Sequence, residues 1–140
     1  MNKYTCITIL VVIIPVVLGD IPCSDPSSLV GQYVGESHEC VALVKAKCSN
    51  MVSFVTSKWV RGRNIKDNCN SISKYTAVAT FTAPGNKYLG HAAIFESCDT
   101  DGVWVWDQWV GQPTHRRKMR FGNMSNWPSN DGSALYTVER

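Results

Sequence analysis

Apolar positions in the first half of the chain recur at the spacing of an amphipathic helix. Residues 38–49 are good helix formers, and three of their side chains fall at helical spacing: Val41, Val44 and Cys48. Ser37 is of a type that caps helix N-termini, and Glu39 places a negative charge in the first turn, where the helix dipole favours it. The pattern therefore predicts a helix that follows Ser37.

Beyond this helix, apolar and polar residues alternate, which is the pattern of β-strands. Residues 74–82 (KYTAVATFT) alternate and are rich in β-forming types, so they predict a strand. Residues 91–96 and 103–109 flank a short loop and predict an antiparallel hairpin, and residues 134–139 (ALYTVE) predict a late strand. One helix followed by antiparallel strands indicates an α+β fold.

The predicted hairpin brings a histidine and an aspartate to one face of the sheet. If its turn is centred on Asp99, Phe95 faces Val103 and His91 faces Asp107. A carboxylate beside an imidazole fixes its tautomer and stabilises the imidazolium, as in a Ser-His-Asp site. His91 and Asp107 are therefore candidate catalytic residues. The alternatives are a structural histidine and a turn residue at the end of a strand.

The N-terminal segment has the organisation of a secretion signal. Lys3 precedes an apolar run, and Val17 and Gly19 have the spacing of a cleavage site. We expect residues 1–19 to be a signal peptide and residues 20–140 to form one extracellular domain. The alternative is an uncleaved anchor, but the apolar run is shorter than the roughly 20 residues of a membrane span. We therefore expect no stable membrane insertion.

Composition and charge narrow the classes of partner. The 140 residues are 44% apolar and 18% charged, which suits a single domain. Without Lys3, 13 of the 14 basic residues remain against 11 acidic ones, a net charge of +2 that is too weak to indicate nucleic-acid binding. One segment is strongly basic, and it is either a solvated face or a rim that attracts anionic polymers such as bacterial wall: His115, Arg116, Arg117, Lys118 and Arg120.

Without Cys6, an odd number of cysteines remains: Cys23, Cys40, Cys48, Cys69 and Cys98. In a secreted chain, an odd number means a free thiol or an intermolecular bridge. Cys40 falls near the third residue of the predicted helix, where free N–H groups and the helix dipole favour the thiolate. The alternatives for Cys40 are a disulfide or a buried apolar role. A thiolate used in catalysis must stay unpaired, so we predict a free Cys40 with the pairs Cys48–Cys69 and Cys23–Cys98, one of three possible pairings of the other four.

Other residue types add fewer candidates. Trp104 and Trp106 fall on the face of the hairpin opposite His91 and are predicted to cover core, whereas Trp59, Trp109 and Trp127 are candidates for the wall of a cleft. The sequence has no close histidine pair, CxxC, HExxH or glycine-rich phosphate loop, so we expect neither a metal nor an organic cofactor. Asn123-Met124-Ser125 is a glycosylation sequon, meaningful in a eukaryotic source.

Four segments together resemble one known family: YVGESHECVALVK, SKYTAVATF, GHAAIFE and VWVWDQWVG. They are similar to the family-2 amidase effectors of bacterial type VI secretion and to their animal-acquired relatives, the domesticated amidase effectors. The resemblance runs from about Leu29 to Arg120, and its wider group is the NlpC-type peptidoglycan cysteine peptidases. It implies a papain-like α+β fold with an N-terminal catalytic helix packed on an antiparallel sheet.

The resemblance also implies roles for the candidate residues. Cys40 would be the nucleophile, His91 the general base and Asp107 the orienting third residue. The reaction would be hydrolysis of a peptide bond in bacterial peptidoglycan, with the D-alanine-to-diaminopimelate crosslink as the expected bond. Tyr75 and the added cysteines depart from the bacterial pattern. These departures leave the catalytic pair intact, but the resemblance does not fix which bond is cleaved or which bacteria are attacked.

The sequence thus predicts a secreted antibacterial cysteine amidase that acts on peptidoglycan as a monomer. Trp59, Trp109, Arg116 and Arg117 are the predicted substrate-binding residues. A rival function is a wall-binding or recognition module that kept the fold and lost turnover. Another is a different thiol chemistry on the same fold, such as acyl transfer to a lipid.

Overall fold

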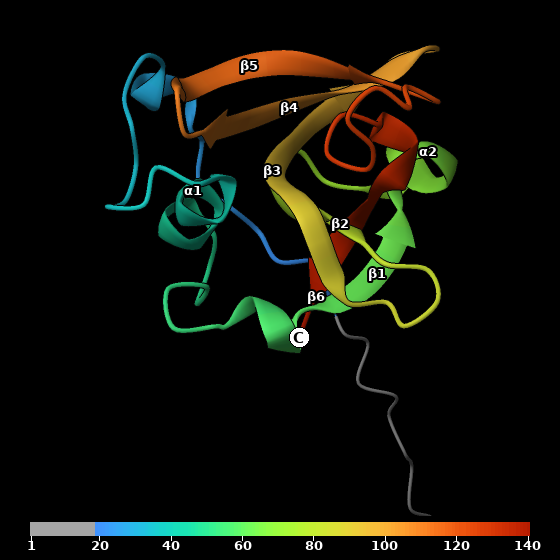
Figure 1. Ribbon diagram of the computed structural model, residues 1–140, viewed down its shortest axis with the longest axis horizontal. Helices are drawn as coiled ribbons and strands as arrows, with labels where there is room; N and C mark the ends of the chain where they lie inside the picture. Colours follow the sequence, from blue (N-terminus) through green and yellow to red (C-terminus); the bar gives the residue numbers. More distant parts are fainter. Residues whose placement is uncertain (1–18) are drawn as a thin grey trace, which may run out of the picture.

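The computed structural model describes residues 19–140, and a six-stranded antiparallel sheet with the order β1-β6-β2-β3-β4-β5 is its centre (Figure 1). The predicted signal peptide, except for Gly19, lies outside the described residues. The strands are β1 (Val60–Asn64), β2 (Thr76–Phe81), β3 (Tyr88–Cys98), β4 (Gly102–Trp109), β5 (Gln112–Arg120) and β6 (Leu135–Glu139). The helices are α1 (Cys40–Lys47) and α2 (Ile65–Asn68), with four 3₁₀ turns at Ser27–Leu29, Thr56–Lys58, Cys69–Ser71 and Gly132–Ala134. The α+β prediction is confirmed.

The two faces of the sheet carry separate hydrophobic cores. On one face, α1 packs against β3 and β4, and Leu43 and Val44 of the helix are fully buried there with Ala92, Ile94 and Trp106. On the other face, α2 and the segment after it cover a second cluster, which includes Ile65, Val78, Phe95, Val103 and Val105. Helix α1 and helix α2 accordingly lie on different sides of the sheet in Figure 1. Alternation along β2, β3 and β4 supplies both cores from the same strands.

Helix α1 is shorter than the sequence pattern predicts. It begins at Cys40 with Glu39 as its N-cap, so Cys40 is its first residue and not its third. The backbone of His38 has a φ of 55°, which is incompatible with a helix. Ser37 does not cap the helix, because its hydroxyl accepts a hydrogen bond from the backbone N–H of Glu39. The residues before Cys40 form a tight turn that aims the start of the helix at the sheet.

The β3–β4 hairpin forms, but its register differs from the predicted one. Phe95 pairs with Val105 and not with Val103, and an irregularity between Phe95 and Ser97 shifts the ladder by one residue. The turn is also centred later than Asp99, since the Asp99 N–H donates to the carbonyl of Gly102. Near the middle of the hairpin the total shift is two residues. A shift of two residues keeps the side chains in this part of the hairpin on their predicted face.

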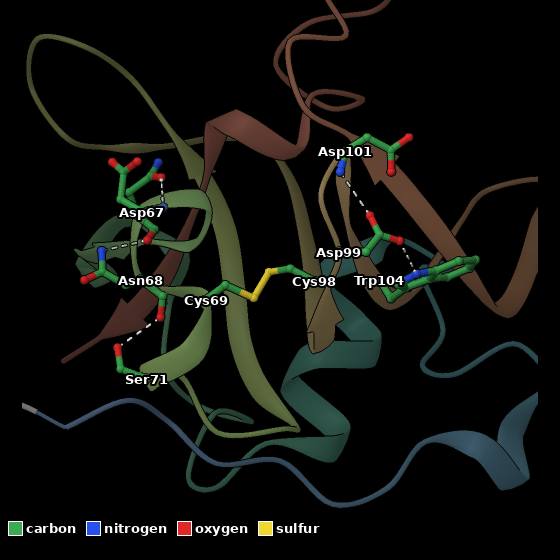
Figure 2. Close-up of a disulfide and its surroundings, with 9 residues drawn as sticks. Asp67, Asn68, Cys69, Ser71, Cys98, Asp99, Asp101 and Trp104 are labelled. Carbon is green, nitrogen blue, oxygen red and sulfur yellow. Dashed lines mark hydrogen bonds between the residues drawn. A yellow bond between two sulfur atoms is a disulfide. The ribbon is translucent and has the colours of Figure 1, made fainter.

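The predicted disulfide pairing is wrong: the bonds are Cys23–Cys48 and Cys69–Cys98. Residues 20–25 run beside the end of α1, and Cys23 and Cys48 form an isolated antiparallel bridge with their Cα atoms 3.8 Å apart. Cys69, in the 3₁₀ turn after α2, lies opposite the end of β3 at Cys98, with a Cα–Cα distance of 6.2 Å (Figure 2). The sequence pattern does not reveal that the irregular lead-in packs against the helix end.

Candidate active site

The thiol of Cys40 is buried at the start of α1. Cys40 is 7% exposed and is the free cysteine among residues 19–140. Its Sγ lies 3.7 Å from the hydroxyl oxygen of Tyr88, at the start of β3. The first N–H groups of a helix have no partner within the helix, so the backbone N–H of Cys40 is available to donate a hydrogen bond to a ligand at the thiol.

A buried glutamine holds the chain that leads into α1. The side-chain amide of Gln108 donates to the carbonyls of Val34 (2.7 Å) and Glu39 (3.0 Å), and its carbonyl accepts from the Val34 N–H (2.9 Å). Gln108 is fully buried on β4, next to Asp107. Alternation along the strand points the two side chains to opposite faces. Two adjacent residues of β4 therefore have separate roles: Gln108 holds the start of α1, and Asp107 supplies the carboxylate of the site.

His91 and Asp107 are in direct contact. The His91 Nε2 atom lies 2.6 Å from Oδ2 of Asp107, whose side chain is fully buried. The His91 N–H donates to the hydroxyl of Thr80 at 2.9 Å, and Gly90, with a φ of 98°, bends β3 just before the histidine. A Cβ at Gly90 would approach Thr80, Pro128 and Ser129 within about 3 Å, so this bend requires glycine. Because Asp107 occupies Nε2, Nδ1 is the nitrogen left to serve Cys40.

The electrostatics of the site favour a thiolate–imidazolium pair. Burial raises the pKa of the Cys40 thiol, but the hydrogen bond and the charge of His91 outweigh burial, and the pKa is lowered overall. Burial lowers the pKa of His91, but the hydrogen bonds with Asp107 and Cys40 and their negative charges raise it to about 9. Each group thus stabilises the charged form of the other, which is the state of an activated cysteine nucleophile.

The thiol and the imidazole line a cavity of about 290 Å³. Trp109, 39% exposed at the end of β4, and Arg117 of β5 form part of its wall. The segment between β5 and β6 closes another side through Ser129 and Asn130. The cavity therefore gives a ligand access to Cys40 and His91 beside an indole ring and a guanidinium group.

The structure separates the predicted substrate-binding residues into two sets. Trp109 and Arg117 line the cavity. Trp59 does not, because it is 3% exposed in the core, where its ring packs edge-on against Tyr88 and its indole N–H donates to the Phe54 carbonyl. Trp59 as a cleft wall is thus contradicted by its burial.

The basic segment is divided by the alternation of β5. Arg116 is not brought to the cavity: its guanidinium pairs with Glu96 and lies 3.9 Å from the ring centre of Trp104. Trp106 is 7% exposed and belongs to the core as expected, whereas Trp104 is only half-buried, beneath Arg116. Adjacent arginines therefore have different surroundings, and only Arg117 faces the site.

Sequence reasoning missed Tyr88, Gln108 and Asn130. Tyr88 reaches the thiol because β3 is irregular between the residues that pair with Ala79 and Phe81. The glycine before His91 is the only local signal of that bend. The position of Gln108 next to Asp107, a candidate catalytic residue, could have indicated its role. Asn130 lies in a segment without a periodic pattern, so nothing in the sequence indicated it.

The described residues offer neither a metal site nor a membrane span. No group of three or more His, Cys, Asp or Glu side chains within residues 19–140 could hold a metal ion. No helix in this part of the chain is long and apolar enough to cross a membrane.

A helix that begins at a buried cysteine, packed on an antiparallel sheet with a histidine–aspartate pair, places the chain in the papain-like class of α+β proteins. The family model described as Domesticated amidase effector 2 matches residues 11–138, and the chain belongs to this family. It is 56% identical to Domesticated amidase effector 2 of Ixodes scapularis, over 85% of this chain and 84% of that protein.

Similarity extends to bacterial proteins. The chain is 31% identical to the Type VI secretion amidase effector 2 protein of Salmonella typhi, over 77% of this chain and 90% of the relative. The solved structure of Type 6 secretion amidase effector 2 superposes with a TM-score of 0.68 at 27% identity, over 84% of this chain and 93% of that one. The shared fold thus spans most of the chain.

Proposed function

We propose that this chain is a secreted cysteine amidase that hydrolyses peptide bonds of bacterial peptidoglycan, with the D-alanine-to-diaminopimelate crosslink as the expected bond. The observation that carries the proposal is the buried Cys40 thiol beside a His91–Asp107 pair at an accessible cavity. The relatives named amidase effectors support the reaction class. Two disulfides support an extracellular site of action for residues 20–140.

The reaction follows the steps of acyl transfer. The Cys40 thiolate attacks the carbonyl carbon of the amide, and the Cys40 N–H at the start of α1 donates to the developing oxyanion. The His91 imidazolium then gives its Nδ1 proton to the leaving amine, and the C–N bond breaks. The neutral imidazole next takes a proton from water, whose oxygen attacks the thioester and releases the acid. Asp107 holds the ring and its tautomer through both halves.

The cavity walls suit a peptide substrate. Trp109 presents an aromatic surface, whereas the guanidinium group of Arg117 is already paired with Asp107 and Asn130. Peptidoglycan stems are short peptides whose backbone and side chains can pack against such an aromatic surface. No metal or organic cofactor takes part in this mechanism.

The experiment that tests the function is digestion of purified sacculi by residues 20–140 with both disulfides formed. Mass spectrometry of the released fragments should show crosslinked stem peptides converted to monomers with a new carboxylate and a new amine. Cys40→Ala should release none of these products and still pellet with sacculi, because the thiol contributes covalent chemistry and little contact. Cleavage of glycan bonds, or equal products from Cys40→Ala, would refute the proposal. Binding without cleavage by the unmodified chain would favour a recognition module.

A further inference from the structure

Asp107 lies close to more basic side chains than the single histidine of a simple triad. Its Oδ2 atom lies 2.6 Å from Nε2 of His91 and also accepts from Nε of Arg117 at 2.8 Å. Its Oδ1 atom is buried without a hydrogen-bond partner in residues 19–140, and Nδ1 of His115 lies 3.6 Å away. Three basic side chains from β3 and β5 thus surround one fully buried carboxylate.

Arg117 is itself fixed from three directions. Its Nη1 donates to Oδ1 of Asn130 at 2.9 Å, its Nη2 reaches the Ser129 carbonyl at 3.5 Å, and its guanidinium carbon lies 5.2 Å from the ring centre of Trp109. The same Nη2 lies 3.4 Å from Nε2 of His91, a longer approach than the 2.8 Å contact between Arg117 Nε and Asp107. The Arg117 side chain is 19% exposed. Arg117 therefore ties Asp107 to the segment between β5 and β6 that forms part of the cavity wall.

We propose that Arg117 is a positioning residue, which fixes the Asp107 carboxylate and through it the orientation of the His91 ring. A lone buried carboxylate can rotate about its terminal torsion and lose its alignment with the imidazole. The guanidinium fork prevents this rotation, because Nε holds Oδ2 while Nη1 is held by Asn130. Arg117 also pairs its charge with that of the fully buried Asp107 side chain, with Nε 2.8 Å from Oδ2.

This role differs from direct recognition of a substrate carboxylate. If Arg117 recognised a substrate carboxylate directly, its loss would weaken substrate binding, and the size of this effect would not depend on Asp107. In positioning, the loss of Arg117 lowers the rate of the chemical step and has little further effect once Asp107 is already altered. The inference rests on the proposed function only for the turnover measurements, since the state of the thiol can be measured without substrate.

The chain offers a charge-matched control in the neighbouring residue. Arg116 is one position away on the same strand and makes a pair of exposed contacts with Glu96 and Trp104, outside the cavity. Arg116→Ala removes the same charge from the same strand without touching Asp107. Any general effect of net charge or of strand stability will therefore appear in both variants.

The first test is the pH profile of Cys40 alkylation by iodoacetamide, between pH 3 and 10, in the full oxidised chain without peptidoglycan. Loss of the aligned imidazolium and of a nearby cation both destabilise the thiolate, so Arg117→Ala should raise the midpoint by about one pH unit. Arg116→Ala should leave it unchanged. Arg117→Lys keeps the charge but cannot bridge Asp107 and Asn130, so it should also raise the midpoint. An unshifted midpoint in both Arg117 variants overturns the inference, whatever the substrate proves to be.

The second test is a double-mutant cycle on sacculus hydrolysis. Arg117→Ala should lower kcat by about 10- to 100-fold with KM nearly constant, as expected for misplaced catalytic groups. In the Asp107→Asn background, Arg117→Ala should lower kcat further by less than about threefold. Guanidinium ion at millimolar concentration should restore part of the activity of Arg117→Ala and none of that of Asp107→Asn.

Three outcomes of the cycle overturn the inference. They are equal losses in both backgrounds, a loss confined to KM, and full activity in Arg117→Lys. If Arg117→Ala fails to fold, as judged by near-UV circular dichroism, Arg117→Lys replaces it in both tests with the same expected results. Hydrolysis absent from the unmodified chain would contradict the proposed function, while the alkylation profile would still decide the role of Arg117.

Discussion

Two clusters of charged side chains lie toward opposite ends of the same pair of strands, β4 and β5. At one end, Asp107 is fully buried between His91 and Arg117. At the other end, beside the turn between β3 and β4, Asp101 contacts Lys118 and Arg120 with its side chain 47% exposed. Figure 2 shows that Asp99 lies near the Cys69–Cys98 disulfide and is hydrogen-bonded both to Trp104 and to the backbone of Asp101. The residue types are alike, but their contact with water differs.

This difference decides which cluster can perform chemistry. A carboxylate removed from water interacts strongly with its neighbours and fixes their protonation, whereas exposed ion pairs are screened and contribute little. A shifted pKa alone does not distinguish the clusters. A hydrogen bond from Lys118 holds the pKa of Asp99 below its ordinary range, although Asp99 is on the surface. Burial beside a nucleophile and a cavity is the feature that the turn cluster lacks.

The largest effect is expected when the base is removed from the buried cluster. In the proposed mechanism, His91→Ala removes both the proton donor to the leaving amine and the cation that stabilises the thiolate. The rate of sacculus hydrolysis at neutral pH should therefore fall by about 10⁴-fold, the upper end of general acid–base contributions. Mass spectrometry of released stem peptides measures the rate. Activity within tenfold of the unmodified chain would remove His91 from the mechanism.

A smaller loss is expected when the buried carboxylate is neutralised. Asp107→Asn retains the size of the side chain but loses the charge that stabilises the imidazolium, so kcat should fall by about 10²-fold. In the proposed mechanism Asp107 orients the imidazole and makes no bond to the substrate, so the loss should be milder than that of His91→Ala. A loss as large as that of His91→Ala would mean that Asp107 takes part directly in the reaction.

The pH dependence should reflect the same buried pair. The lowered pKa of Cys40 and the pKa of about 9 for His91 bracket the range in which thiolate and imidazolium coexist. The value of kcat/KM should rise as Cys40 ionises and fall as pH passes about 9, where His91 loses its proton. Because the folded state raises this pKa above the ordinary 6.5, its contribution to stability is complete below pH 6.5 and is lost as pH passes about 9. An alkaline limb near 6.5 would contradict the pair.

The smallest effect is expected at the exposed cluster. Asp101→Asn weakens contacts with Lys118 and Arg120 that water already screens. The melting temperature and the rate of hydrolysis should both match those of the unmodified chain within error. A loss of activity there would show that the turn cluster contributes to the site and would break the contrast between the two ends.

The sequence predicted the parts of this account that depend on local pattern. Alternation located the strands around His91 and Asp107, and helical spacing located the segment of Cys40. The face shared by His91 and Asp107 was predicted although the register was displaced, because a displacement by two residues preserves the face. The resemblance of four segments supplied the family, which the match to residues 11–138 confirms.

What the sequence could not give depends on contacts between distant segments. The partner of Cys23 is set by packing of the irregular lead-in against the end of α1. Tyr88 reaches Cys40 through a bend in β3, and Asn130 meets Arg117 from a segment with no periodicity. The burial of Trp59 and the outward position of Arg116 are likewise tertiary facts. Pattern alone assigns both to a substrate surface.

The central claim is that the buried cluster holds Cys40 as a thiolate beside an imidazolium. The most direct measurement is alkylation of the unreduced chain by iodoacetamide from pH 3 to 10, with the labelled peptide identified by mass spectrometry. We predict a label on Cys40 alone, a midpoint below the ordinary thiol value of about 8.5, and a higher midpoint in His91→Ala. A label on Cys23, Cys48, Cys69 or Cys98, or a midpoint at the ordinary thiol value, would contradict the claim.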